Sequence, residues 1–288
     1  MIFLFLAILG SALIPVLFRG FSDWHINLFW AIPLNYLTCV FVGSIWGAHL
    51  LDVTSLPRQP WLWLAVLQGV ILAVNFFLLA YTAQRAGVSI AALASRLSVA
   101  IPSILAFLLY GDSLSLVKLA GLGAAVLSLY LCTMAHDRKA SLRLFPGTFL
   151  PLLVFFTFGC YFFVIKYAQA HYLNEASYHD YVMTGFLFAF LTALGICIGR
   201  RLLILTQVGW LDLVGGTLLG IVNYFAVYAL VKALAVQGWE TSQVLPIYSI
   251  GVIALSSILA LLIFRETLSR QKTFGLAVGL VAVILLNR

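Results

Sequence analysis

Long apolar runs dominate the chain and constrain its fold more than any other feature. A helix that crosses the roughly 30 Å hydrocarbon layer of a membrane needs about 20 mainly apolar residues. Ten segments meet this requirement: residues 1–18, 27–47, 61–83, 88–110, 114–134, 148–168, 178–199, 209–234, 241–264 and 272–287. These runs are apolar on all sides and about twice as long as the alternating strands of a membrane barrel. We therefore predict an all-α polytopic membrane protein with ten transmembrane helices.

Composition excludes the main soluble classes. Of 288 residues, 64% are hydrophobic and 9% are charged, whereas soluble domains carry about 25% charged residues. The net charge of +7 is spread over an apolar chain, so we expect it to set membrane orientation and not to bind nucleic acid. Ten spans leave little room for a soluble domain. The predicted organisation is a single membrane domain over residues 1–288, multi-pass in the cell inner (plasma) membrane, with the lipid bilayer as its surroundings.

An internal repeat divides the chain. Residues 112–121 (DSLSLVKLAG) and 266–275 (ETLSRQKTFG) share an acid, a hydroxyl residue, Leu-Ser, Lys and Gly in the same order. Residues 74–77 (VNFF) likewise match residues 222–225 (VNYF). We predict a first five-helix repeat over 1–134 and a second over 148–288. Because five is odd, the second half enters the membrane from the opposite side, and such inverted repeats occur in many secondary transporters.

The repeated motif, Asp112-Ser113-Leu114 and Glu266-Thr267-Leu268, resembles one found in the drug/metabolite transporter superfamily, in its EamA-like ten-helix branch. The resemblance covers essentially the whole chain. It implies a 5+5 inverted fold, transport of small solutes and cytoplasmic termini. The Lys and Arg count implies the opposite orientation, because ten basic residues lie in odd-numbered connections and four lie in or beside even-numbered ones. The orientation of the termini stays open.

Arg96 is the most informative charged residue. It lies about nine residues into the predicted 88–110 span, where a guanidinium costs about 2.5–3.5 kcal/mol on insertion scales and therefore usually faces a polar cavity. Small residues at helical spacing around it would let it reach such a cavity. We predict that Arg96 holds a carboxylate or phosphate in bidentate fashion. The alternative is a structural role, in which Arg96 bonds backbone carbonyls or a buried tyrosine.

Other polar residues extend the predicted substrate site. They lie on apolar helices, where polar side chains avoid lipid. The predicted members are Asn35, Gln68, Asn75, Tyr161, Asn223, Tyr224, Gln243, Tyr248 and Ser249. Tyr181 and Thr184 add to this lining. Asn75 and Asn223 occupy equivalent places in the two halves, where they either bind substrate or form interhelical hydrogen bonds.

The remaining polar features predict structure. Asp112 and Glu266 precede the fifth and tenth spans, where an acid complements the helix dipole. The four cysteines sit in apolar segments without metal-ligand spacing, so we expect buried thiols. No hydrolytic triad, metal cluster or phosphate-binding loop is found in the sequence, which predicts no enzyme, no cofactor and no metal.

These features predict a secondary transporter or exchanger that works by alternating access. The expected cargo is a small polar metabolite, an amino acid or another carboxylate- or phosphate-bearing solute. The third, fourth, eighth and ninth helices would form most of the cavity. Two alternatives on the same fold stay open: a flippase for a polyprenyl-phosphate-linked or lipid substrate, and a non-transporting membrane partner subunit. The protein would be a monomer or homodimer.

Overall fold

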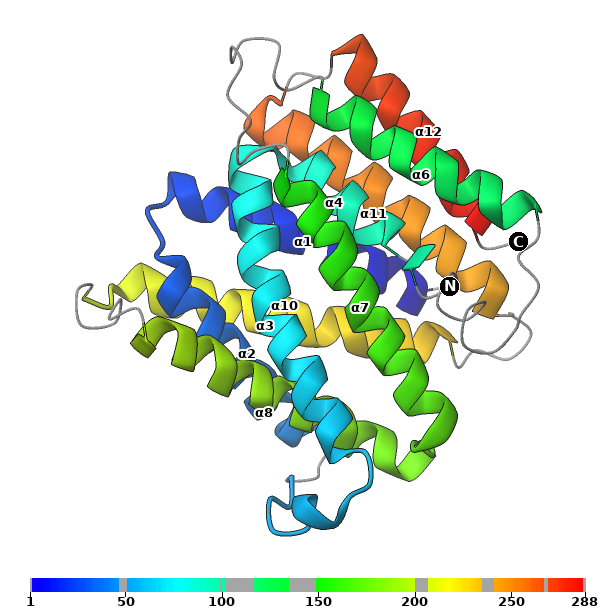
Figure 1. Ribbon diagram of the computed structural model, residues 1–288. Coiled ribbons are helices and arrows are strands. Elements are labelled where there is room, and N and C mark those ends of the chain that lie inside the picture. Colours follow the sequence, from blue (N-terminus) through cyan, green and yellow to red (C-terminus); the bar gives the residue numbers. More distant parts are fainter. Residues whose placement is uncertain are drawn as a thin grey trace. The chain divides into compact units, whose positions relative to one another are not determined.

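The protein is all-helical over the part of the chain that the structure describes. The computed structural model describes residues 2–46, 51–98, 100–101, 116–134, 149–199, 207–234, 241–266 and 269–286. Its elements are α1 (Ile2–Asp23), α2 (Leu28–Trp46), the 3-10 turn η1 (Leu56–Arg58), α3 (Leu62–Arg85), α4 (Val88–Leu97), α6 (Leu116–Met134), α7 (Phe149–His171), α8 (Glu175–Gly199), α10 (Trp210–Leu234), α11 (Thr241–Phe264) and α12 (Arg270–Leu286) (Figure 1). No strand occurs in these residues.

The described helices coincide with the predicted spans. Seven of them, α1, α2, α3, α7, α8, α10 and α11, are long and apolar enough to cross a membrane. Shorter apolar helices over Val88–Leu97, Leu119–Ser128 and Thr273–Leu285 fall within the other three predicted spans. Most of the second half of the predicted 88–110 span lies outside the described residues. The polytopic membrane fold is confirmed, while the inverted relation between the halves stays a prediction.

Two compact units make up the chain. Unit 1 comprises Met1–Arg19, Leu78–Gly159 and Phe225–Arg288, and unit 2 comprises Gly20–Phe77 and Cys160–Tyr224. Each unit therefore combines segments from both halves of the sequence.

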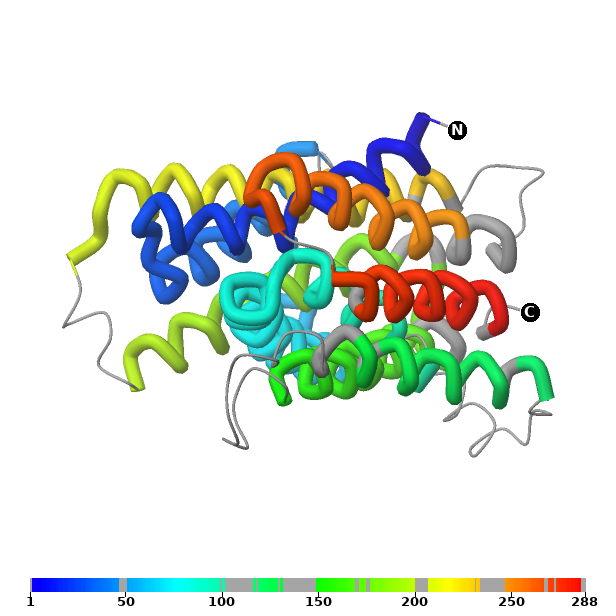
Figure 2. The backbone as a smooth tube through the Cα atoms, turned by 90° about the horizontal axis from the view of Figure 1, so that it is seen from above, coloured from blue at the N-terminus to red at the C-terminus, as the bar shows by residue number. Residues whose placement is uncertain are grey.

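In unit 1, α6 and α12 lie side by side (Figures 1 and 2). Gly275 and Gly279 form a GxxxG motif on α12, and such small residues let membrane helices approach closely. The hydroxyl of Ser128 on α6 donates a 2.6 Å hydrogen bond to the Gly275 carbonyl. A Cβ at Gly279 would lie 2.7 Å from the Ser128 hydroxyl oxygen and 2.5 Å from Leu93 of α4. The glycines thus bring α4, α6 and α12 together.

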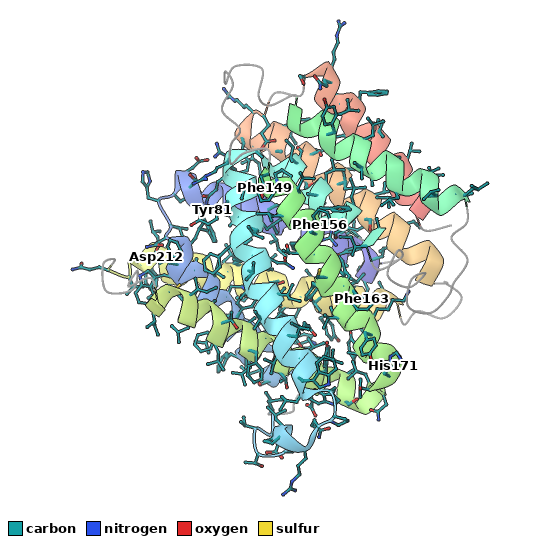
Figure 3. The ribbon with its side chains drawn as sticks, in the orientation of Figure 1. Tyr81, Phe149, Phe156, Phe163, His171 and Asp212 are labelled. Atoms are coloured by element: carbon teal, nitrogen blue, oxygen red, sulfur yellow. The ribbon has the colours of Figure 1, made fainter. Side chains whose placement is uncertain are left out.

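Unit 2 also has glycines where two helices approach closely. A Cβ at Gly220 of α10 would lie 2.6 Å from the Asn35 carbonyl of α2. On α3, a Cβ at Gly69 would lie 2.7 Å from the Gly185 carbonyl of α8. Asp212, at the start of α10 (Figure 3), accepts a 2.7 Å hydrogen bond from the backbone N–H of Asn27, just before α2. Close backbone contacts and one carboxylate therefore position α2 against α10.

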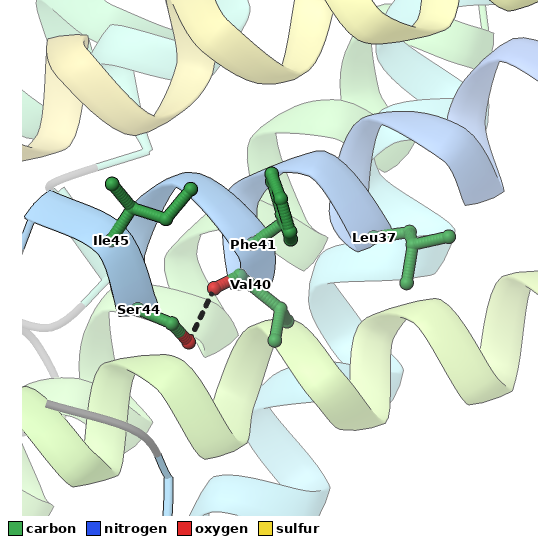
Figure 4. A pocket seen from close by; sticks show the side chains of 5 residues that line it. All are labelled: Leu37, Val40, Phe41, Ser44 and Ile45. Atoms are coloured by element: carbon green, nitrogen blue, oxygen red, sulfur yellow. Dashed lines mark hydrogen bonds between the residues drawn. The ribbon is translucent and has the colours of Figure 1, made fainter.

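Other helix faces are suited to lipid. A shallow groove of about 390 Å³ runs along one face of α2 and is lined by Leu37, Val40, Phe41, Ser44 and Ile45 (Figure 4). Its one polar group is satisfied within the helix, because the Ser44 hydroxyl donates to the Val40 carbonyl at 2.9 Å. On α7, the exposed side chains of Phe149 and Phe156 lie seven residues apart (Figure 3). Such apolar faces match a hydrocarbon environment.

The packing of α12 yields a stability prediction. Gly279→Val should lower the free energy of unfolding by about 1–3 kcal/mol, the usual cost of overpacking, because the added atoms displace Ser128 from its hydrogen bond. Gly123→Val on α6 is the matched control, since a Cβ there meets nothing within 4 Å. Denaturation in detergent would measure both. Equal losses for the two variants would contradict the close approach.

Candidate functional site

Three helices of unit 1 meet around the Arg96 side chain. The guanidinium of Arg96, on α4, lies over the ring of Tyr248, on α11, with 4.7 Å between its central carbon and the ring centroid. The Tyr248 hydroxyl shares a 2.6 Å hydrogen bond with the hydroxyl of Ser11, on α1. Ser11 and Tyr248 are both buried. The ring face attracts the cation, and the hydroxyl bond to Ser11 holds the ring in place.

The Arg96 guanidinium keeps unused hydrogen-bonding capacity. Its Nε is buried and has no hydrogen-bond partner among the described residues. The tyrosine ring attracts the positive charge through its face and accepts no conventional hydrogen bond, so the planar set of N–H donors stays available. Sequence analysis offered a buried tyrosine as a structural partner for Arg96, and the structure supplies one. This contact orients the guanidinium without consuming the donors that an anion would need.

Glu266 holds the start of the Arg96 helix. Its Oε1 accepts a 2.8 Å hydrogen bond from the backbone N–H of Val88, and its Oε2 lies 3.4 Å from the Ser89 hydroxyl, which donates to it. Gly87 precedes them with φ +105°, a backbone conformation that favours glycine, and a Cβ there would lie 2.9 Å from the Glu266 carboxylate. The carboxylate thus caps α4, where it complements the helix dipole.

This cap differs from the sequence expectation. Glu266 was expected to serve the N-terminus of its own following helix, which begins at Arg270 as α12. It serves α4 instead, a helix of the first half that lies 178 positions away in sequence. Asp112, its counterpart in the motif, lies outside the described residues.

Further polar contacts tie neighbouring helix ends to this region of unit 1. The Gln84 side-chain amide, at the end of α3, donates to the Phe18 carbonyl of α1 at 2.9 Å. Arg19 returns the contact by donating to the Gln84 carbonyl at 2.9 Å. The Arg19 guanidinium also lies 5.9 Å from the ring centroid of Phe264, the last residue of α11. The ends of α1, α3 and α11 are therefore connected next to the start of α4.

In unit 2, Asn223 makes an interhelical contact. Its amide Nδ2 donates to Asn35 Oδ1 at 3.3 Å, linking α10 to α2. The Cys39 thiol donates to the Gly220 carbonyl at 3.4 Å beside them. Asn35 keeps a buried Nδ2 without a partner among the described residues. Asn223 therefore has the helix-joining contact that the sequence left as one of two alternatives.

The predicted site residues fall in both units. Arg96, Tyr248 and Ser249 belong to unit 1, and Asn35, Gln68, Asn75, Tyr161, Asn223 and Tyr224 belong to unit 2. The structure brings Arg96 to Tyr248 and Asn223 to Asn35. The Gln243 side chain lies outside the described part of the chain. Ser11 was missed, because a single serine in an apolar helix gives no pattern to detect.

The cysteine prediction holds only in part. Cys39 and Cys197 are buried, whereas Cys160 is exposed on α7 and so contradicts the expectation of a buried thiol. A thiol behaves as a small apolar group and is acceptable on a surface that faces lipid. The Cys132 side chain lies outside the described residues. Among the described residues, no group of His, Cys, Asp and Glu could hold a metal ion.

A family model matches the first part of the chain. Residues 1–134 match the EamA-like transporter family, which confirms the resemblance to the drug/metabolite transporter superfamily over this part of the chain. Together with the apolar helices, this match supports a multi-pass membrane protein. The matching family is described as one of transporters.

Two whole-length relatives carry no stated function. An uncharacterized protein of Haemophilus influenzae is 26% identical over 291 residues, covering 98% of this chain and 96% of the relative. A protein crystal structure has a TM-score of 0.58 at 18% identity and covers 99% of this chain and 94% of its own. The likeness to this crystal structure supports the fold alone.

The Glu266 cap predicts a stability effect. Glu266→Ala should lower the free energy of unfolding by about 1 kcal/mol, because the Val88 N–H loses its acceptor. Asp52→Ala is the matched control, since Asp52 bonds to Thr54 and Ser55 within its own exposed turn. Thermal melting of the purified protein would compare them. The cap would be refuted if Glu266→Ala melted at the temperature of the unaltered protein.

A double-mutant cycle tests the bond between Ser11 and Tyr248. Ser11→Ala and Tyr248→Phe should each cost about 1 kcal/mol, and the double variant should cost no more than either alone, because all three lose the same hydrogen bond. Tyr248→Leu should cost about 1–2 kcal/mol more than Tyr248→Phe, since it also removes the ring under Arg96. If the loss in the double variant equalled the sum of the losses in Ser11→Ala and Tyr248→Phe, the hydrogen bond between the two residues would be excluded.

Proposed function

We propose that the protein is a secondary transporter or exchanger of a small polar metabolite that works by alternating access. The cargo is an amino acid or another solute that bears a carboxylate or phosphate. The match to a transporter family supports the class, and the proposed mechanism follows from the inverted repeat predicted for the sequence.

One observation carries the choice of cargo: the cationic Arg96 side chain has a buried Nε without a partner among the described residues, while its face rests on Tyr248. An unsatisfied guanidinium in a membrane span is costly, and a carboxylate or phosphate would remove that cost by accepting two parallel hydrogen bonds. Arg96 is therefore the proposed anion-binding residue, and Tyr248 with Ser11 positions it. Of the other predicted residues, Ser249 lies beside Tyr248 on the same helix.

Binding measurements test the anion site. The purified protein would be screened by thermal shift against amino acids, organic acids and sugar phosphates, because a ligand stabilises the folded state by mass action. Arg96→Gln should weaken binding of the stabilising solute about 10- to 100-fold, the effect of losing hydrogen bonds to a charged group. Arg96→Lys should weaken it less than Arg96→Gln does, because the ammonium keeps the positive charge, although it cannot bind in bidentate fashion.

Arg85 provides the matched control. Its guanidinium also lies over a tyrosine ring, 5.3 Å from the Tyr81 centroid, but it is exposed at the end of α3. Arg85→Gln should leave binding and counterflow into proteoliposomes unchanged. If both Arg96 variants bound and exchanged solute as the unaltered protein does, the proposed anion site would be wrong.

A further inference from the structure

Four aromatic side chains of unit 2 form one connected cluster at the end of α7. The rings of Tyr167 and His171, one helical turn apart on α7, stack with 4.4 Å between their centroids. Tyr172, the residue after α7, has its ring centroid 6.3 Å from each of them. Trp63, near the start of α3, meets the Tyr172 ring edge-on at 6.5 Å. We call Trp63, Tyr167, His171 and Tyr172 the aromatic cluster, and Figure 3 labels His171 at its place on α7.

A buried core holds the aromatic cluster in place. Trp61 is 2% exposed and packs edge-on against Tyr181 of α8, with 5.8 Å between ring centroids. Trp63, two residues further on, is 53% exposed. The turn after α7 is closed by a 2.9 Å hydrogen bond from the Tyr172 N–H to the Ala168 carbonyl. Trp61 therefore stabilises the fold, while Trp63 presents much of its ring on the surface.

The aromatic cluster lies at the ends of two membrane spans. Trp63 is the second residue of the apolar span Leu62–Arg85, and Tyr167 is the last but one residue of the apolar span Phe149–Ala168. Tryptophan and tyrosine at such positions lie at the level of lipid headgroups, because their rings are apolar and their tips are polar. The cluster is therefore placed to meet the headgroup layer.

The polar tips of the cluster donate hydrogen bonds. The Trp63 indole N–H only donates, and the hydroxyls of Tyr167 and Tyr172 donate as well as accept. The His171 Nδ1 lies 3.0 Å from the Tyr167 carbonyl, and because a carbonyl only accepts, the imidazole donates and keeps the two stacked rings together. Lys166, next to Tyr167 in the sequence, is exposed and adds an ammonium group. The complementary ligand group is an anion that accepts hydrogen bonds.

We propose that the aromatic cluster binds the phosphate of a phospholipid headgroup. A phosphodiester offers only acceptor oxygens to the indole, the phenols and the ammonium. Phe163 lies one turn before Tyr167 on α7, with 6.1 Å between ring centroids, and continues the aromatic surface toward the middle of the span, where acyl chains lie (Figure 3). This apolar continuation favours a lipid over free phosphate. The inference goes beyond the proposed function, because the lipid is a bound partner and not the transported solute.

Variants that keep each ring and remove one donor test the site. Trp63→Phe removes the indole N–H and Tyr172→Phe removes the hydroxyl, while both retain an aromatic ring for packing. Trp24→Phe is the matched control, because Trp24 is also 53% exposed and follows a span, α1, but lies outside the aromatic cluster. All three variants should melt as the unaltered protein does, since the changes lie on the surface.

Native mass spectrometry of the purified full chain, titrated with lipid, measures binding. The probes are phosphatidylethanolamine and phosphatidylglycerol, which share the phosphodiester, and a diacylglycerol with the same acyl chains, which lacks it. The unaltered protein should bind both phospholipids at a saturable site and more tightly than diacylglycerol. Trp63→Phe and Tyr172→Phe should each weaken phospholipid binding about 10-fold, the effect of losing one hydrogen bond to a charged group. Trp24→Phe should leave it unchanged.

Three results would overturn the phospholipid site. They are phospholipid binding by Trp63→Phe and Tyr172→Phe equal to that of Trp24→Phe, equal affinity for diacylglycerol and the phospholipids, and displacement of the lipid by excess inorganic phosphate, which would make free phosphate the ligand. Arg96→Gln should leave phospholipid binding unchanged, whereas it should weaken binding of the proposed solute. A failure of the phospholipid site is therefore distinguishable from a failure of the proposed function.

Discussion

Close approach of helix backbones is the constraint on which the rest of the structure depends. Lipid tails are as apolar as leucine, so burial of apolar side chains gives membrane helices little reason to associate. This chain replaces that driving force with glycines at contact points: Gly279 against Ser128, Gly220 against Asn35, and Gly69 against Gly185. Two of these contacts also carry a polar bond, from the Ser128 hydroxyl to the Gly275 carbonyl and from the Cys39 thiol to the Gly220 carbonyl. Tight packing and polar contact are thus one feature in this protein.

That arrangement explains why the candidate sites lie at helix interfaces. Arg96 and Tyr248 meet where α4 faces α11, and the Gln68 amide lies where α3 faces α8. The faces directed away from neighbours, such as Leu37, Phe41 and Ile45 of α2, are apolar. A polar side chain between helices can satisfy its partner, stay open to a solute, or do both in part. Arg96 does both, because a tyrosine ring holds its charge in place while its Nε has no partner among the residues that the structure describes.

The spans and the order of the helices could be predicted from the sequence, because hydropathy is a local property. The cost of a buried charge singled out Arg96 as a candidate for the same reason, and its role stays a proposal. Contacts between distant segments could not. Ser11 as the partner of Tyr248, and Glu266 as the cap of α4, depend on which helices become neighbours. The exposure of Cys160 was missed for the same reason, because the sequence of a helix that is apolar on all sides does not indicate which face meets lipid. Composition predicts whether a helix lies in lipid or in water, whereas packing decides which other helices it contacts.

The bond between Glu266 and Val88 also has a consequence for biogenesis. The ribosome releases α4 long before it reaches residue 266, so the nascent helix must enter the membrane with its first N–H groups uncapped. Its final position can be reached only after nearly the whole chain has been synthesised. The helix that carries Arg96 therefore reaches its final contacts late. A truncated product that ends with α11, before Glu266, would contain Arg96 but lack the carboxylate that caps its helix.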